Sequence, residues 1–200
     1  MVHFFIEQCR HPSGFIGGIM VRIWNVFLFR YAKKYMNKIE FDEKDIVLDV
    51  GCGGGRFIQF LSKHKIGQTI YGVDDSQTAI DQSIKLNRIS IKNKYVYLLK
   101  EKVENLSLRS DSIDKAFAFQ THIYWDNLEQ ALMRLHNVLK KTGELHIICE
   151  KYKIDYHLTS YAETDQFQEL LHSVGFDDVR VSESNGMVYF HCLKWGGINV

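Results

Sequence analysis

Proline and cysteine are scarce in this 200-residue chain, which has one proline, Pro12, and four cysteines. None of the cysteines forms a Cys-x-x-Cys pair, and no cysteine lies at a metal-site spacing from the nine histidines. A chain of this length can bury a core large enough to fold without disulfide bonds. The sequence therefore predicts free thiols, no metal site and a cytoplasmic location.

An excess of charge and a long apolar run are also missing. Lys and Arg number 25 against 24 Asp and Glu, and this +1 balance argues against a strongly basic nucleic-acid surface. The most apolar stretch, residues 15–32, is interrupted by Arg22, Asn25 and Arg30, whereas a membrane span needs about 20 apolar residues. No secretory signal pattern opens the chain. We expect a protein that neither binds nucleic acid nor inserts stably into a membrane.

Apolar segments with strand character alternate with amphipathic helical segments over residues 44–194. Strands are predicted at residues 46–50, 69–74, 95–99, 114–119 and 145–149, and helices at 56–61, 76–87, 128–139 and 165–174. A turn at 140–144 is expected to end the third helix at its glycine, and a turn at 182–185 is expected to join final strands 176–181 and 186–194. This alternation predicts an α/β fold with a parallel sheet and right-handed crossovers.

The first strand runs directly into a glycine-rich loop, residues 51–55, that precedes a helix. Glycines in such a loop allow the backbone to approach a ligand closely. The next strand ends in Asp74, which is 19 residues beyond Gly55. A carboxylate at this distance can accept hydrogen bonds from both hydroxyls of a ribose. A nucleoside-containing cofactor is therefore predicted.

The glycine spacing argues against a dinucleotide. A G-x-G-x-x-G fingerprint would need a third glycine where Arg56 stands. The loop instead offers close backbone and a carboxylate, Asp49, which suit a sulfonium with an amino-acid tail. A nicotinamide-dependent oxidoreductase remains the alternative that shares the fold.

Residues 47–55, Val-Leu-Asp-Val-Gly-Cys-Gly-Gly-Gly, resemble motif I of the class I S-adenosylmethionine-dependent methyltransferases, and residues 71–76 resemble their second motif. The resemblance extends over about residues 44–194 and is to the small-molecule branch that includes ubiquinone and menaquinone methyltransferases. It implies a Rossmann-like, seven-stranded, mostly parallel sheet with an antiparallel C-terminal hairpin and helices on both faces. A non-catalytic protein that binds S-adenosylmethionine or S-adenosylhomocysteine is the second alternative.

The resemblance also implies which residues hold the cofactor and where the acceptor binds. The implied cofactor residues are Asp49, Gly51, Cys52, Gly53, Gly55, Asp74, Asp75, Glu101, Lys102, Val103 and Gln120. The family usually has an Asp near the adenine amino group where this chain has Lys102, and a lysine cannot accept that hydrogen bond. Glu101 or a backbone group is expected to replace it.

The run that follows the fourth strand, residues 120–125, is expected to lie at the ligand-binding edge of the sheet. His122 is the candidate general base, because its usual pKa is close to neutral. Tyr124 and Trp125 are candidate walls of the acceptor pocket. The alternative for this run is plain packing, with a solvated His122.

Residues 1–40 precede the resemblance. Ile16, Met20, Ile23, Phe27 and Tyr31 recur at helical spacing, which predicts an N-terminal helix that packs on the domain, forms a lid over the substrate or touches a membrane surface. The whole chain is expected to be a single methyltransferase domain, a monomer or homodimer, with core residues 44–194. Its expected reaction is methyl transfer to a small molecule, with S-adenosylhomocysteine as product.

Overall fold

The computed structural model describes residues 19, 33, 35, 36 and 39–195. The chain divides into two compact units, unit 1 (Met1–Lys102) and unit 2 (Val103–Val200). The predicted N-terminal helix over residues 16–31 lies outside the described residues, apart from residue 19. Within the described part, no helix has the length and apolarity to cross a membrane.

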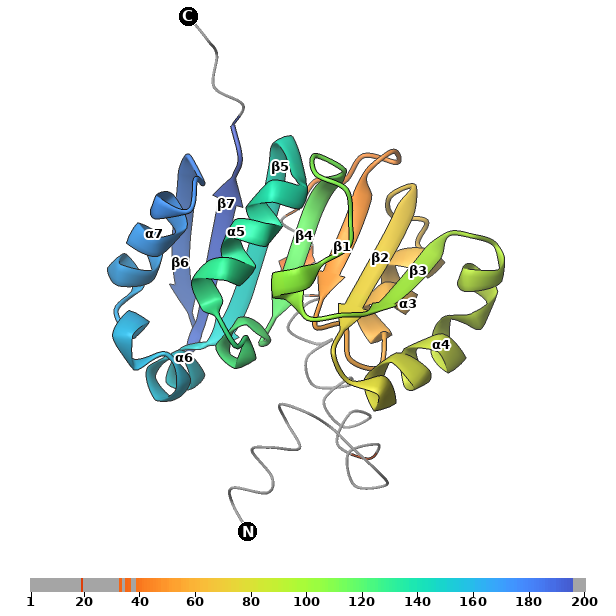
Figure 1. Cartoon of the computed structure of the whole chain (residues 1–200), viewed down its shortest axis with the longest axis horizontal. Helices are drawn as coiled ribbons and strands as arrows, with labels where there is room; N and C mark the ends of the chain where they lie inside the picture. The colour runs from red at the N-terminus through yellow and green to blue at the C-terminus, as the bar shows by residue number, and fades with distance from the viewer. Residues whose placement is uncertain (1–18, 20–32, 34, 37–38, 196–200) are drawn as a thin grey trace, which may run out of the picture. The chain divides into compact units, whose positions relative to one another are not determined.

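Unit 1 is a parallel β-α-β-α-β arrangement (Figure 1). Its elements are β1 (Ile46–Val50), α3 (Arg56–Lys63), β2 (Thr69–Asp74), α4 (Gln77–Lys92) and β3 (Val96–Lys100). The strands β1 and β2 pair from Ile46 opposite Thr69, and β2 pairs with β3 in the same parallel sense. Ser76 caps α4, since its Oγ accepts a hydrogen bond from the Ala79 amide at 3.3 Å. The elements predicted for this half are confirmed, with α4 extending five residues beyond residue 87.

Unit 2 combines parallel and antiparallel pairing. Its elements are η1 (Val103–Asn105), β4 (Ile113–Phe119), η2 (His122–Tyr124), α5 (Leu128–Val138), β5 (Leu139–Glu150), α6 (Lys151–His157), η3 (Thr159–Tyr161), α7 (Thr164–Ser173), β6 (Asp178–Ser184) and β7 (Met187–Leu193). β4 and β5 are parallel, whereas β7 is antiparallel to both β5 and β6. In Figure 1, α5 and α7 cover one face of these strands, and the rings of Phe167 on α7 and Phe190 on β7 lie 4.8 Å apart.

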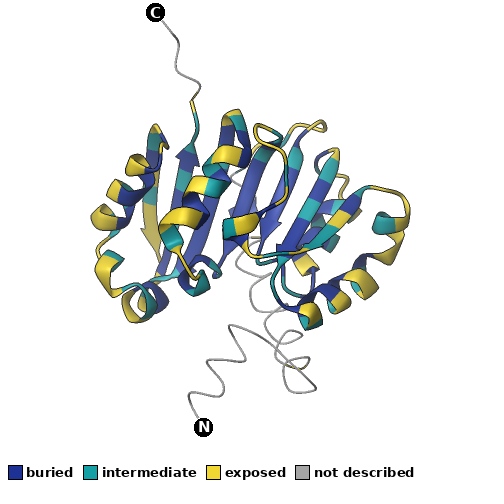
Figure 2. Ribbon diagram, viewed as in Figure 1, coloured by how far each residue is buried: buried dark blue, intermediate teal, exposed yellow. Residues whose placement is uncertain are grey.

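The seven strands form one sheet in the order β3-β2-β1-β4-β5-β7-β6. This order confirms the predicted Rossmann-like fold with an antiparallel C-terminal hairpin. The strands supply half of the buried apolar residues of the described chain, among them Leu48, Ile70, Phe117 and Ile147, which are fully buried. Figure 2 shows the same division, because the strands are mainly buried while each helix exposes its outer face.

Two predicted turns are wrong. Residues 140–144 belong to β5, because α5 ends at Val138 and Leu139 is already extended. Thr142, with φ 72°, deforms this strand near its start. The hairpin between β6 and β7 turns at Asn185-Gly186, where φ is 53° and 72°, and not at residues 182–185. Asn-Gly with two positive φ values matches the tight turn that suits the twist of paired strands.

Candidate functional site

The glycine loop of unit 1 is fastened to the neighbouring strand. The amides of Gly51 and Cys52 both donate to the Val73 carbonyl oxygen, at 2.8 and 2.9 Å. Gly51, Gly53 and Gly55 all have positive φ, between 51° and 77°. Residues other than glycine rarely adopt positive φ, so the backbone conformation of the loop requires glycine at these positions. The loop is therefore a shaped backbone surface at the carboxyl end of β1.

Gly55 has a packing role as well as a place in the loop. It caps α3, and a Cβ on it would lie 2.1 Å from Ser83 Oγ. The Asn87 side-chain amide donates to the Gly55 carbonyl at 3.1 Å. Gly55 thus sets the close approach of α3 to α4, a contact that the spacing of glycines along the sequence did not reveal.

Asp74, at the end of β2, orders the loop through its carboxylate. Its Oδ2 accepts from the Gly53 amide at 2.9 Å, and its Oδ1 accepts from the Ser76 amide at 2.9 Å. A carboxylate offers about four acceptor positions, so one carboxylate can bond backbone amides and a ligand's hydroxyls together. The structure brings Asp74 and Gly53 together, as the predicted site requires.

Asp49 is a buried acid beneath the same loop. Its Oδ2 has no hydrogen-bond partner among the described residues. Burial, reinforced by the nearby Asp74, raises its pKa to about 8. An unpartnered buried acceptor beside a second acid favours a ligand that brings hydrogen-bond donors or positive charge. The donor set of unit 1 therefore fits a cationic nucleoside cofactor.

Cys52 contributes its backbone to the loop while its side chain is buried. Burial raises the pKa of this thiol well above its usual value, and Asp74 and Asp49 act in the same direction. The side chain therefore stays an uncharged thiol and has no thiolate character for nucleophilic chemistry.

Glu101 and Lys102, the two residues beyond β3, differ in burial. β3 ends at Lys100, which lies opposite Asp74 in the parallel pair of β2 and β3. Glu101 follows and is half-buried, whereas Lys102 is exposed. Glu101 is thus the better placed acceptor in unit 1. Asp75 is half-buried just beyond β2, and Val103 is a buried residue that opens η1 in unit 2.

Gln120, the residue after β4, forms its side-chain hydrogen bonds with other residues of unit 2. Its φ is 62°, an unusual value for a residue other than glycine. Its Oε1 accepts from the Glu150 amide and the Cys149 thiol, both at 3.3 Å. These bonds tie the end of β4 to the end of β5, which gives the predicted cofactor residue a structural role.

His122 is fully buried, not solvated. Its ring lies 5.5 Å from the ring of Phe167 and 6.2 Å from that of Trp125. Neither ring nitrogen has a hydrogen-bond partner among the described residues. Burial lowers the pKa of His122 to about 3, so the imidazole is neutral throughout the physiological range.

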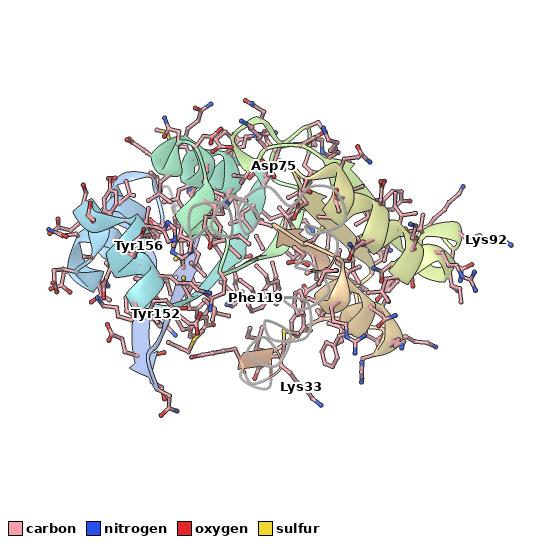
Figure 3. The ribbon with its side chains drawn as sticks, turned by 90° about the horizontal axis from the view of Figure 1, so that it is seen from below. Lys33, Asp75, Lys92, Phe119, Tyr152 and Tyr156 are labelled. Atoms are coloured by element: carbon pink, nitrogen blue, oxygen red, sulfur yellow. The ribbon has the colours of Figure 1, made fainter. Side chains whose placement is uncertain are left out.

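Tyr124, near His122, contacts α6, an element that the sequence did not predict. The Tyr124 ring lies 5.1 Å from the ring of His157, and both Tyr124 and Trp125 are half-buried. Figure 3 marks Tyr152 and Tyr156 on α6, and these side chains are 62% and 67% exposed. Their i, i+4 spacing was the available signal, because it places both rings on one face of a helix.

Comparison with known proteins identifies a family for this site. The family described as "Methyltransferase domain" matches residues 48–147, which is half of the chain. These residues include the glycine loop, Asp74 and the His122 run.

Relatives and solved structures agree with this match. "Uncharacterized methyltransferase YdaC" of Bacillus subtilis is 23% identical over 154 residues, or 75% of this chain and 81% of YdaC. "Probable cobalt-precorrin-6B C(15)-methyltransferase (decarboxylating)" of Methanococcus maripaludis is 30% identical over 149 residues, 74% of this chain and 73% of that protein. A crystal structure of an S-adenosylmethionine-dependent methyltransferase from Aquifex aeolicus has a TM-score of 0.64 at 22% identity, covering 80% of this chain and 88% of that one.

Proposed function

The chain belongs to the methyltransferase domain family and is an S-adenosylmethionine-dependent enzyme, and we propose that it methylates a small molecule. When bound, the cofactor supplies a methyl group already activated on a positively charged sulfur. The protein then has to bind the cofactor, orient the acceptor and exclude water. The residues of the two units divide these tasks.

Unit 1 supplies the cofactor contacts in this proposal. Gly51 and Gly53 offer close backbone, and Asp74 accepts from the ribose hydroxyls while it holds the loop. Asp49 carries the proposal, because its buried Oδ2, which has no hydrogen-bond partner among the described residues, can be satisfied by a cationic ligand. Cys52, Gly55 and Asp75 complete the loop region, and Glu101 is the proposed acceptor for the adenine amino group.

Unit 2 supplies the proposed acceptor region, in the run between β4 and α5. Tyr124 and Trp125 are half-buried aromatic rings of the kind that wall a pocket for an organic acceptor. His122 offers a neutral imidazole whose nitrogens are not engaged by other described residues. Because burial lowers its pKa to about 3, the expected role as general base is replaced by a positioning one: we propose that a ring nitrogen hydrogen-bonds the acceptor and orients it.

Several observations support a small acceptor. The net charge of +1 offers no excess of positive charge for nucleic acid. The Methanococcus relative is named for a cobalt-precorrin, itself a small molecule.

Cys52, Cys149 and Cys192 are free, buried cysteines, which suits a reducing cytoplasm. We propose a monomer or homodimer in that compartment.

The cofactor assignment is tested by comparing S-adenosylhomocysteine with its 2′-deoxy analogue. Asp74→Asn should weaken binding of S-adenosylhomocysteine by about 1.5–3 kcal/mol, because the variant loses a charged acceptor. It should weaken binding of the deoxy analogue much less, since that ligand lacks one of the hydroxyls. Titration calorimetry measures both affinities, and Asp81→Ala, a change at an exposed acid on α4, is the matched control.

Equal losses of affinity for the two ligands would show that Asp74 only holds the loop and does not contact the ribose.

The acceptor class is tested separately by following S-adenosylhomocysteine formation with a panel of metabolites, with proteins and with RNA. Turnover on a metabolite supports the proposal. Turnover confined to protein or RNA contradicts it.

A further inference from the structure

A second cluster of titratable groups lies on the sheet of unit 2, outside the run between β4 and α5. It consists of Glu144 and His146 on β5 and His191 on β7, and we call it the Glu-His-His cluster. His146 and His191 are directly opposite each other in the antiparallel pair, and Glu144 is two residues before His146 on the same face. The strand register alone thus brings three residues distant in sequence together.

This cluster lies on the face of the sheet that α7 does not cover. Phe190 contacts Phe167 of α7, and successive residues of a strand point to opposite faces, so His191 points the other way. Glu144 pairs with Lys115, near the beginning of β4, whereas Gln120 and His122 follow the end of that strand. The cluster is therefore separate from the proposed acceptor region.

The geometry of the cluster is that of a metal site. One possible ligand atom from each residue, two imidazole nitrogens and a carboxylate oxygen, lies within 4.8 Å of the others. Glu144 Oε2 is 2.7 Å from His191 Nε2 and 3.3 Å from His146 Nε2. Ligand atoms around a tetrahedral Zn²⁺ are about 3.3 Å apart, given bonds of about 2.0–2.1 Å.

His146 is the residue that points most directly to a ligand. It is 1% exposed, and its Nε2 makes no hydrogen bond with any described residue, although Glu144 Oε2 is only 3.3 Å away. Its Nδ1 lies 2.8 Å from the Tyr189 hydroxyl. With the proton on Nδ1, the Nε2 lone pair faces the carboxylate, and a cation between the two is favourable; with the proton on Nε2, the imidazole faces Glu144 Oε2 as a donor at 3.3 Å. A metal-bound histidine typically has such a partner on its other nitrogen.

Both carboxylate oxygens of Glu144 have partners within the protein. Lys115 Nζ donates to Oε1 at 2.7 Å, and His191 Nε2 is hydrogen-bonded to Oε2 at 2.7 Å, so a bound ion must replace the proton between Oε2 and His191 Nε2. The side chains of Glu144 and His191 are 22% and 23% exposed, which gives an ion a path from solvent.

We propose that Glu144, His146 and His191 bind a divalent transition-metal ion, with Zn²⁺ the best match, which links β7 to β5. Two imidazoles and one carboxylate are ligands that Zn²⁺ accepts, with a fourth position left for water. The sequence predicted no metal, because the histidines come from different strands and show no ligand spacing along the chain. The ion is assigned a role in holding the hairpin, and it takes no part in methyl transfer.

The test is metal titration of tag-free, chelator-treated protein at neutral pH. Calorimetry with Zn²⁺ should give one site per chain with a dissociation constant in the micromolar range or tighter. Co²⁺ should give the visible absorption of a tetrahedral site with nitrogen and oxygen ligands, and no thiolate band. Glu144→Gln and His191→Ala should each weaken Zn²⁺ binding at least about 100-fold, whereas His64→Ala, at an exposed histidine, should leave it unchanged.

A fourth variant separates a metal site from an ion-pair network. Lys115→Met removes a positive charge beside Glu144 and should tighten Zn²⁺ binding by roughly three- to tenfold. S-adenosylhomocysteine affinity serves as the check that each variant is folded. No saturable Zn²⁺ binding to the wild type, or equal binding by the wild type and His191→Ala, would overturn the proposal.

Discussion

A single buried acid, Asp49, couples the pH of the solution to both folding and cofactor binding. Its pKa is about 8 in the folded protein and about 3.9 in an unfolded chain. Between these values the folded state holds one more proton than the unfolded state. The free energy of unfolding should therefore fall as the pH rises from about 4 to about 8, by up to about 1.4 kcal/mol per pH unit from this group. Asp49→Asn should remove this part of the fall, as urea titrations at a series of pH values would show.

The same residue predicts proton release on ligand binding. At pH 7 Asp49 is mainly protonated, and a cationic ligand beside it favours the ionised form. S-adenosylmethionine should therefore displace up to one proton from the wild type and none from the Asp49→Asn variant. Calorimetry in two buffers of different ionisation enthalpy measures this number. Identical proton release by both proteins would place the ligand's charge away from Asp49.

His122 has a pH dependence unlike that of an exposed histidine. Because burial lowers its pKa to about 3, the turnover of the wild type should show no inflection from His122 between pH 6 and pH 9. His122→Ala should lower turnover at least about tenfold with little change in cofactor affinity, and His122→Leu, which fills the same space, should do the same. His64→Ala is the surface control. Wild-type turnover in both His122 variants would make His122 a core residue only.

At the scale of elements, β5 contains a strained residue that can be tested alone. Thr142 has φ 72°, a conformation that costs a β-branched residue about 1–2 kcal/mol. Asn tolerates this conformation, so Thr142→Asn should stabilise the protein by about 0.5–1 kcal/mol in urea unfolding. Thr159→Asn, at an exposed threonine with negative φ in η3, should change stability little. A destabilised Thr142→Asn variant would show that the threonine makes contacts worth more than the strain.

The elements that the sequence predicted are those whose signals are local. The strand over residues 69–74 has the predicted bounds because a largely apolar run ends at two consecutive acids, Asp74 and Asp75. By contrast, α6 starts directly from β5 at Lys151 without a capping side chain, so its only local signal is the i, i+4 spacing of Tyr152 and Tyr156. The wrong turn at residues 140–144 has a similar cause, since a glycine can end a helix or lie within a bent strand.

The candidate sites divide in the same way. The glycine loop and Asp74 could be predicted because the residues of a β-α-β unit are joined at a fixed distance along the chain. The burial of His122 and the bonds of Gln120 depend on packing against α7 and β5, which the sequence does not encode locally. The Glu-His-His cluster depends on the register of β7 against β5, and that register is set by the hairpin turn and by the strands together.

For the whole molecule, cofactor binding should appear as thermal stability. S-adenosylhomocysteine at about 100 times its dissociation constant adds about 2.7 kcal/mol to the free energy of unfolding. For a chain of this size that corresponds to a rise in melting temperature of about 5–10 °C. Hydrogen exchange should show the largest gain in protection in unit 1, around residues 51–57. A rise of equal size in the Asp74→Asn variant would contradict the assignment of the ligand to this loop.

The bond between Asp74 and the Gly53 amide gives this binding site a thermodynamic advantage. The carboxylate that is proposed to meet the ribose is already fixed by two backbone amides, and the loop beside it is fixed in turn. A ligand that enters such a site need not freeze side-chain rotation or backbone freedom there. The conformational entropy of the loop and of this carboxylate was lost when the chain folded, so binding should be fast. The backbone of unit 1 should move little when the ligand binds.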